Sequence, residues 1–584
     1  MSDHHYFNNQ SLAMNHVNHI HKIYLLLGTV IALSGISGCK KYLTENNPSG
    51  RTAETYYNTA QGFEDLVRSN YSNLRPIITG DQESAPGSFN FGSLYWLGTD
   101  VFTTGGTSDP NPMNIYGPNM NSLTGDVDAF WKQLYSSIGV ANTTLYWSAL
   151  VTGEATATLS IRIGVAKALR AFYYFLLVET FGDIPLVLTP STTAVLAYTR
   201  TPEAAVYTQI VQDLTDAVSV LPATTTDLGR VTKGMAQHLL AKVYLQRAGK
   251  TYGGGNADYT LAATTAAAVI NSGTYSLQPV FSSLFDPTIT NFQVNPEVIF
   301  SVQYSTNTTT NTWQDYLKNT FIGNYLHNAF TMDMSVYPAI GRTGFYNKAE
   351  GFFVPTPFFF TLFDKTRDAR YLATSWNAIN AQIASGGFAV GDTVIYFPDT
   401  AWTATQKAAV KYYVYNPDEY RVGTTFSQRS FPTFKKFREL NLVFGDGGGA
   451  RDTYVFRLAE TYLIAAEAYL QSGNLPMALQ YYNAIRKRAA KPGNNPSTGI
   501  PYATEMQVSS LTIDDILDER ARELAGEEIR WFELKRTGRL LSRVLADNDE
   551  AKAEGKLDAH NLLRPIPQSQ IDLNRDSFPQ NPQY

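Results

Sequence analysis

The segment 457–492 constrains the fold more than any other part of this chain. Apolar and small residues recur there at three- and four-residue steps on both sides of Ser472-Gly473-Asn474, which is the spacing of one face of an α-helix. Gly473 is of the type that commonly ends a helix, because glycine readily adopts the left-handed conformation needed there. A new periodic run begins directly after Asn474. The segment therefore predicts two antiparallel helices joined by a short turn.

This predicted hairpin resembles the tetratricopeptide repeat. Small residues stand where the two helices would touch, and aromatic residues fill the gaps between them, as at Ala468-Tyr469, Ala478 and Tyr482. Ile485 departs from the pattern, which prefers a small residue there. The departure argues against strict membership of the repeat family and leaves the predicted hairpin unchanged.

A single hairpin cannot bury its apolar face, so further hairpins are expected. Candidate helix pairs lie at about 62–147, 158–222, 232–273 and 453–490. The predicted fold is mainly α, with four dispersed tetratricopeptide-like helical hairpins that form an α-superhelical scaffold. A large irregular insertion of loops and short strands lies over about 275–450 and contains a predicted strand at 295–304.

The composition narrows the class of protein. A hydrophobic content of 44% and a charged fraction of 17% are typical of a globular protein, and 36 Tyr and 32 Phe make the chain rich in aromatic residues. A net charge of −5 without a long Lys/Arg run gives no electrostatic reason to expect nucleic acid as a partner. The single Cys excludes an internal disulfide framework.

The position of that cysteine is informative. Lys22 precedes an apolar run over 23–33, which is shorter than the roughly 20 helical residues needed to span a bilayer and has the order of a secretory signal. The tripeptide Ile-Ser-Gly before Cys39 resembles the lipobox of bacterial lipoproteins, with a branched residue followed by two small ones.

The resemblance to a lipobox implies a lipid anchor. Residues 1–38 are then a lipoprotein signal peptide, with Met1 or Met14 as the start, and Cys39 is the lipid attachment site, with palmitate among its acyl chains. Two or more chains, at about 0.8 kcal/mol per buried CH₂, hold a protein stably on a membrane. Residues 39–60 would form a lipidated tether that leads to one domain over 61–584.

Motifs for catalysis and for metal binding are missing. Beyond the predicted cleavage point the histidines are His238, His327 and His560, and their spacing matches no zinc motif. With Cys39 acylated no thiol nucleophile remains, and the chain has no GxSxG motif. Carboxylates gather in 514–541, where interleaved arginines favour one amphipathic helix with salt bridges at its surface and in its packing. The sequence predicts no enzyme, no metal and no cofactor.

Several segments together resemble the SusD/RagB family, the surface lipoproteins of Bacteroidetes that partner TonB-dependent transporters. They are the lipobox with Cys39, FWKQLYSSIGVAN, ALRAFYYFLLVETFGDIPL, RVTKGMAQHLLAKVYLQ, NPEVIFSVQ, RLAETYLIAAEAYL, ERARELAGEEIRWFELKRTGRL, and the terminal RPIP and QNPQY. They follow the family order over almost all of the mature chain. The resemblance implies a single SusD-like domain, lipid-anchored at the outer membrane and facing the exterior, with a SusC-like transporter as its partner.

Aromatic residues outside the repeats suggest an oligosaccharide ligand. An exposed aromatic ring offers a flat platform to the apolar face of a sugar, worth no more than the roughly 1–3 kcal/mol per ring seen with nucleobases. In the family, ligand contacts come from the loop ahead of the second helix and from the insertion. The candidate binding residues implied here are Trp313, Trp96, Tyr116, Phe102 and Tyr325, with Asp100 and Asn114 as polar partners. Trp131 and Trp531 fall on helical faces and are expected in the core.

The function expected from these features is non-catalytic capture of oligosaccharide at the cell surface, followed by delivery to the transporter. Three alternatives stay open. The protein binds a different nutrient, such as peptide; it is a surface glycoside hydrolase, which needs only two suitably spaced carboxylates; or it is a helical scaffold for protein partners. The last is disfavoured because so many aromatic residues lie outside the repeats.

Overall fold

The computed structural model describes residues 52–79, 90–104, 111–191, 193–288, 294–305, 323–341, 343–346, 351–420, 430–440 and 449–584. The chain divides into two compact units, 1–58 and 59–584. In the first, Thr52 caps the short helix α2 (Ala53–Tyr56). The predicted signal peptide, Cys39 and Trp313 lie outside the described residues. Among the described helices, none combines the length and the apolar character that crossing a membrane requires.

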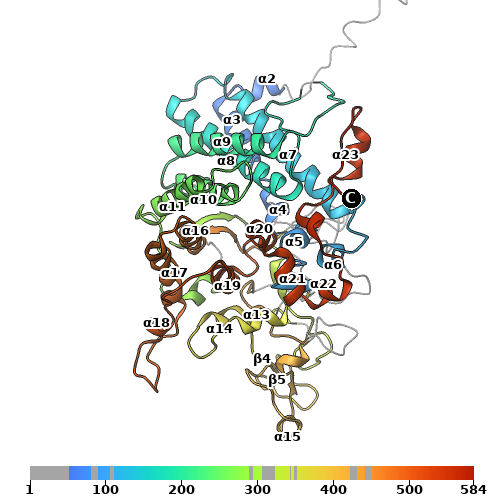
Figure 1. Cartoon of the computed structure of the whole chain (residues 1–584), viewed down its shortest axis with the longest axis vertical. Coiled ribbons are helices and arrows are strands. Elements are labelled where there is room, and N and C mark those ends of the chain that lie inside the picture. The colour runs from blue at the N-terminus through green and yellow to red at the C-terminus, as the bar shows by residue number, and fades with distance from the viewer. Residues whose placement is uncertain are drawn as a thin grey trace, which may run out of the picture. The chain divides into compact units, whose positions relative to one another are not determined.

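The second unit is built on paired helices. The pairs are α3 (Ala60–Ser69) with α7 (Gly125–Trp147), α8 (Thr156–Phe181) with α9 (Glu203–Val220), α10 (Lys233–Ala248) with α11 (Asn256–Ile270), and α16 (Leu458–Gln471) with α17 (Leu475–Ala489). α11 also packs against α16, although a large insertion separates them in sequence. Figure 1 shows the green α10 and α11 beside the brown α16 and α17. The predicted set of four dispersed hairpins is confirmed.

The turn between α16 and α17 follows directly from its sequence. Gly473 has a φ of +83°, a left-handed conformation that glycine adopts without a steric penalty. The side chain of Asn474 accepts a hydrogen bond from the backbone N–H of Met477 at 3.2 Å and so caps α17. The rings of Tyr469 and Tyr481 stack across the two helices, with 5.6 Å between their centroids. The hairpin therefore needs no contact from elsewhere to define its turn.

Short strands and short helices make up the described part of the insertion. β2 (Val298–Val302) pairs antiparallel with β7 (Thr453–Arg457), which confirms the strand predicted at 295–304. β1 (Phe102–Thr104) pairs with β3 (Phe353–Pro355), and β4 (Ala378–Asn380), β5 (Thr393–Tyr396) and β6 (Tyr413–Val414) form a small sheet. The helices are η1 (Phe281–Phe285), α12 (Leu326–Phe330), α13 (Pro357–Thr361), α14 (Arg370–Thr374), α15 (Ala404–Ala408) and η3 (Pro417–Glu419).

The single charged helix predicted over 514–541 is wrong. The structure has α19 (Ile513–Leu524), α20 (Arg530–Arg536) and α21 (Leu540–Asp547) instead. Gly526 breaks the first junction with a φ of +74°, and a Cβ there would lie 2.8 Å from the ring of Phe437 and 3.0 Å from that of Phe330. Rings from the insertion thus occupy the space that a continuous helix would need.

The remaining helices border these elements. α4 (Leu74–Thr79), α5 (Asn90–Tyr95) and α6 (Pro112–Ile115) precede α7, and α18 (Tyr502–Glu505) precedes α19. The chain closes with α22 (Asp549–Glu554), η5 (Ala559–Leu562) and α23 (Gln568–Leu573). In the C-terminal tail, the side chain of Asn581 donates hydrogen bonds to the carbonyl oxygens of Phe181 at 3.0 Å and Arg564 at 2.8 Å. The RPIP and QNPQY motifs therefore meet at the end of α8.

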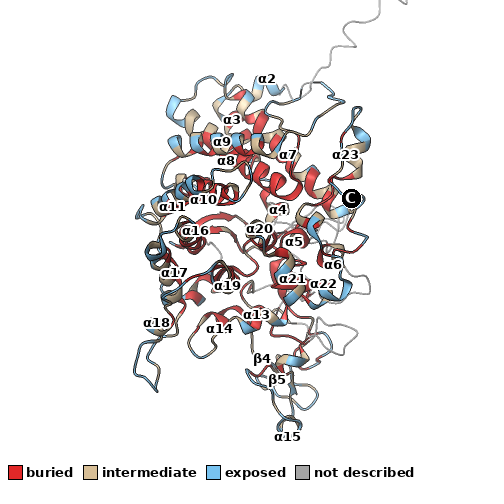
Figure 2. Cartoon of the chain, viewed as in Figure 1, coloured by how far each residue is buried: buried red, intermediate tan, exposed pale blue. Residues whose placement is uncertain are grey.

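The core runs through the helical stack and into the insertion. Figure 2 shows buried residues along α8, α10 and α16, with exposed residues toward the outer faces of α9 and α11. Trp131 and Trp531 are buried, as predicted. Their indoles belong to the helix packing.

One buried histidine gives a pH-dependent prediction. Burial lowers the pKa of His327 in α12 to about 3, whereas an unfolded histidine titrates near about 6.5. The neutral ring therefore contributes stability above about pH 6.5 that is lost as the pH falls toward the folded pKa. When the pH falls from about 7 to about 5, the unfolding free energy of the parent protein should decrease by roughly 2 kcal/mol more than that of His327→Gln. Urea unfolding of both proteins at the two pH values tests this, and equal losses would contradict it.

Candidate ligand-binding site

Helix α19 carries its charges into the core. Thr512 and Asp515 form a capping box that starts the helix. Glu519, Arg520 and Glu523 are fully buried, because α14 and α16 pack against this helix. The sequence prediction of salt bridges is confirmed: Glu519, Arg520 and Glu523 lie in the core, while Asp514 and Asp518 lie nearer the surface and pair with Arg543. Tertiary packing on the charged face of the helix decides the difference.

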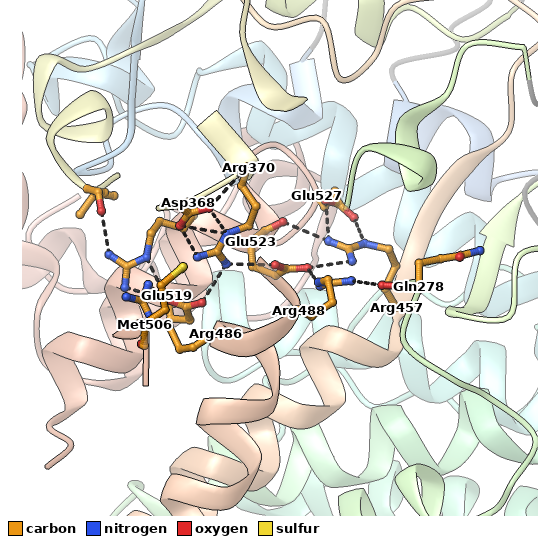
Figure 3. A network of polar contacts seen from close by, with 12 residues as sticks. Gln278, Asp368, Arg370, Arg457, Arg486, Arg488, Met506, Glu519, Glu523 and Glu527 are labelled. Carbon is orange, nitrogen blue, oxygen red and sulfur yellow. Dashed lines mark hydrogen bonds and ion pairs between the residues drawn. The ribbon is translucent and has the colours of Figure 1, made fainter. Parts of the chain in front are cut away.

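Figure 3 shows the buried ion network that results. Arg370, at the start of α14, lies 2.8 Å from Glu519 and 3.1 Å from Glu523. Arg457, at the end of β7, lies 3.1 Å from Glu523 and 2.6 Å from Glu297. Glu527 pairs with Arg457 and Lys436, and Glu297 also pairs with Arg488. Residues far apart in sequence are thus tied to the same few carboxylates.

Positive charge keeps these carboxylates ionised. Burial alone raises the pKa of Glu523, but the charges of Arg488, Arg457 and Arg370 outweigh burial and lower the pKa to about 2. At Glu519, burial is likewise outweighed by neighbouring guanidinium groups, which hold its pKa well below the ordinary range. Removing one charged side chain from such a network leaves another buried charge uncompensated. The network therefore holds its segments in one arrangement.

Three of the segments held by this network form the walls of a pocket of about 610 Å³. η1 and the turn after it contribute Phe285 and Asp286, and α14 with the residues around it contributes Leu372 and Trp376. The segment 430–440 contributes Lys435 and Arg438. Ser282, Ser283, Pro287, Ala369 and Ala373 complete the lining. We refer to it as the Trp376 pocket.

Each wall of the Trp376 pocket is anchored by a different cation of the network. Arg370 holds α14 through Glu519. Arg488 lies over the ring of Phe281 in η1, 5.4 Å from its centroid. Lys436 holds the third wall through Glu527. Beneath the pocket, Phe281, Leu284, Phe285, Val298, Ala373 and Tyr454 form a hydrophobic cluster. The pocket therefore has a rigid floor and fixed walls.

Trp376 gives the pocket a partly exposed aromatic face. Its ring meets that of Tyr346 edge-on with 5.2 Å between centroids, and Tyr346 meets Phe345 at 4.8 Å. Phe345 is 41% exposed, and the guanidinium of Arg438 lies 3.9 Å from its ring centroid. An indole supported by packed rings, with hydroxyl and cationic donors beside it, suits a ligand with both an apolar face and polar substituents.

Two other pockets have polar side chains that are engaged within the protein. One of about 540 Å³ is lined by residues of α7 and the C-terminal segment. There, the amides of Asn142 and Asn574 donate hydrogen bonds to the carbonyl oxygens of Val187 and Tyr198. The other, of about 590 Å³, lies beside α13 and includes the ion pair of Lys365 and Asp399, whose charged atoms are 3.1 Å apart. We take the Trp376 pocket as the candidate because it combines a partly exposed indole with two cations that have no carboxylate partner among the described residues.

The structure buries the six predicted binding residues that it describes. Trp96, Phe102, Tyr116 and Tyr325 are at most 5% exposed, and Asp100 and Asn114 are fully buried. None of these rings offers a face to solvent. The seventh candidate, Trp313, lies outside the described residues.

Most of these buried residues meet at a junction with the C-terminal helices. The indole N–H of Trp96 donates to the carbonyl oxygen of Glu528 at 2.8 Å. The carboxylate of Asp100 lies 2.7 Å from Arg530 and 2.8 Å from Arg543. The side chain of Asn548 donates to that of Asn114 at 3.2 Å. These partners lie more than four hundred residues away along the chain, so local sequence does not reveal them.

Sequence reasoning missed Trp376, Lys435 and Arg438 as a group. The available signal was a pair of lysines within the aromatic stretch FPTFKKFREL, in the same insertion as Trp376. Periodicity does not distinguish Lys435, which lines the pocket, from its neighbour Lys436, which is buried against Glu527. Only the pairing of remote segments makes that distinction.

A buried trio of carboxylates has the spacing of a metal site. The ligand atoms of Glu460, Glu528 and Glu533 lie within 4.8 Å of one another. Arg520 contacts all three, at 3.0, 2.8 and 3.3 Å, and Lys242 lies 2.5 Å from Glu460. These side chains already supply the positive charge that a metal ion would bring, so the trio acts as an ion-pair network that joins α10, α16, α19 and α20.

These observations define an α-helical repeat protein whose large insertion carries a rigid, aromatic pocket. The model of the SusD family matches residues 296–584, and a second model, described as starch-binding and associating with the outer membrane, matches residues 102–245. The chain belongs to the SusD family.

Known relatives share its length and its fold. SusD-like protein P2 of Formosa agariphila is 26% identical over 570 residues, which cover 95% of this chain and 98% of the relative. A solved laminarin-binding SusD-like protein matches with a TM-score of 0.67 at 24% identity, over 90% of this chain and all of its own. Surface glycan-binding protein A of Bacteroides thetaiotaomicron, solved with laminarihexaose, gives 0.66 at 21% identity, over 90% and 99% of the two chains.

Proposed function

We propose that this protein is a non-catalytic, lipid-anchored glycan-binding protein of the cell surface, which captures oligosaccharide and passes it to a TonB-dependent SusC-like transporter. The observation that carries the proposal is the Trp376 pocket, in which a supported indole is flanked by polar donors. Two structural relatives are described as binding laminarin or laminarihexaose. Membership of the SusD family supports the transporter as the partner.

The expected affinity is modest. An aromatic platform contributes no more than about 1–3 kcal/mol per ring. Two or three such contacts correspond to dissociation constants between roughly millimolar and micromolar. This range suits a protein that captures a ligand and then releases it to a partner.

Capture without cleavage fits the chemistry of the pocket. A glycoside hydrolase generally requires two carboxyl groups that flank the scissile bond. Asp286 is the one carboxylate in the described lining, and the buried carboxylates of the network are bound by arginine and lysine side chains. Release of reducing ends from a polysaccharide by the purified protein would favour the hydrolase alternative.

Substitution of Trp376 tests the site. We expect Trp376→Ala to weaken the binding of any glycan that the parent protein binds by about 5- to 100-fold, since it removes one aromatic platform. Isothermal titration calorimetry against a panel of neutral and acidic oligosaccharides measures this. Trp402→Ala is the matched control, because Trp402 is also partly exposed in the insertion and does not line the pocket.

Two results would count against the proposal. If Trp376→Ala binds every glycan with the affinity of the parent protein, the Trp376 pocket is not the glycan-binding site. Binding of peptides without binding of any saccharide would favour the alternative of a different nutrient.

A further inference from the structure

Two cations that line the Trp376 pocket have no carboxylate partner in the described part of the chain. The Nζ of Lys435 makes no hydrogen bond or ion pair there, although its backbone N–H is fixed by the carbonyl oxygen of Thr374 at 2.8 Å. Arg438 donates through Nε to the carbonyl oxygen of Phe345 at 2.9 Å. Its two terminal nitrogens have no partner among the described residues. Lys436, between them, is paired with Glu527.

The two charges are also partly withdrawn from water. Burial lowers the pKa of Lys435, and the nearby charge of Arg438 lowers it further. Burial also lowers the pKa of Arg438. Buried charges in proteins are normally paired or coordinated. An anion in this pocket would relieve both the desolvation and the mutual repulsion.

The charge of the lining favours an anion as well. Among the described residues of the lining, Asp286 is the one carboxylate, and it accepts hydrogen bonds from the backbone N–H of Thr288 at 2.9 Å and from the Thr288 hydroxyl at 2.6 Å. Lys435 and Arg438 therefore leave one positive charge in excess. The whole chain carries a net charge of −5, so this excess is a property of the pocket and not of a generally basic protein.

We propose that the Trp376 pocket binds an acidic sugar residue, with the ring on Trp376 and its anionic group between Lys435 and Arg438. This inference rests on the proposed glycan-binding function and names the class of glycan. The anionic group is a carboxylate, as in a uronic acid, or a sulfate ester. The planar fork of a guanidinium matches two oxygens of an anion, while an ammonium acts as a point charge.

The test is calorimetry on the mature chain with three probes of similar length: oligogalacturonate, sulfated carrageenan oligosaccharide and neutral laminarihexaose. The parent protein should bind at least one acidic probe about tenfold more tightly than the neutral one. The double variant Lys435→Gln/Arg438→Gln should lose about tenfold or more in affinity for that probe, as expected for charge-assisted contacts. Its affinity for a neutral probe should change by less than about twofold.

Two controls accompany the double variant. Arg68→Gln removes a cation whose side chain is 63% exposed on α3, outside the pocket, and should leave all affinities unchanged. Thermal unfolding of each variant establishes that it is folded. The acidic probe that binds, carboxylate or sulfate, identifies the anionic group.

Three outcomes would overturn the inference. If the double variant binds the acidic probe as tightly as the parent protein does, the two cations do not hold the anion. If the parent protein binds only laminarihexaose, the class of sugar is wrong and the glycan-binding function stands. If it binds no saccharide in this set or in the wider panel, the proposed function itself fails.

Discussion

Replacing Arg457 with methionine is expected to lower the free energy of unfolding by about 3–5 kcal/mol, because it leaves the carboxylates of a buried ion network without one of their positive partners. Arg457 contacts Glu297 at 2.6 Å, Glu523 at 3.1 Å and Glu527 at 2.9 Å. Arg370, Arg488 and Lys436 would remain to compensate the carboxylates of Glu297, Glu523 and Glu527. Urea unfolding followed by circular dichroism measures the effect.

The control for Arg457→Met is Arg68→Met. Arg68 pairs with Glu64 at 2.8 Å on the surface of α3, and its side chain is 63% exposed. An exposed pair of this kind is worth less than about 1 kcal/mol. A similarly small loss for Arg457→Met would show that the buried network does not hold the insertion on the helical scaffold.

The second large effect concerns the predicted anchor. Cys39→Ala is expected to abolish the incorporation of labelled palmitate and to release the protein from the membrane fraction, because no acyl chain remains. Each buried CH₂ of a lipid chain contributes about 0.8 kcal/mol, so the loss of several chains removes the whole driving force for membrane binding. Metabolic labelling and fractionation of cells that express the full chain measure both effects.

A conservative change in the same motif is the matched control. Ser37→Ala exchanges one small residue of the predicted lipobox for another, so labelling and membrane association should persist. If the parent protein itself takes up no label and separates with the soluble fraction, the lipoprotein assignment is wrong. The glycan-binding pocket would be unaffected by that result.

The helical scaffold was predictable because its signals are local. Helix period, the glycine at 473 and the cap at 474 act within a few residues of one another, and the structure has the predicted pairs. The strand at 295–304 was equally clear from its β-branched residues. The break at Gly526 was not, because it depends on Phe330 and Phe437, which lie far away in the sequence.

The candidate site was not predictable in the same way. An aromatic residue in a loop has the same local signature whether it is exposed or buried, and Trp96 is buried because the turn between α19 and α20 and the insertion supply partners for it. Trp376 is partly exposed because it lines the pocket, and the ring of Tyr346 packs against it. Whether a charge is compensated also depends on remote segments, as Lys435 and Lys436 demonstrate.

The amino-acid sequence alone therefore determined the paired helices, the dispersed order of the hairpins and the family likeness, since periodicity and turn chemistry are properties of short segments. The tertiary structure decided which charges of α19 are buried, which aromatic rings are exposed and which cations have no carboxylate partner among the described residues. Burial and ion pairing depend on contacts between residues hundreds of positions apart. Those contacts exist only once the insertion has packed on the scaffold.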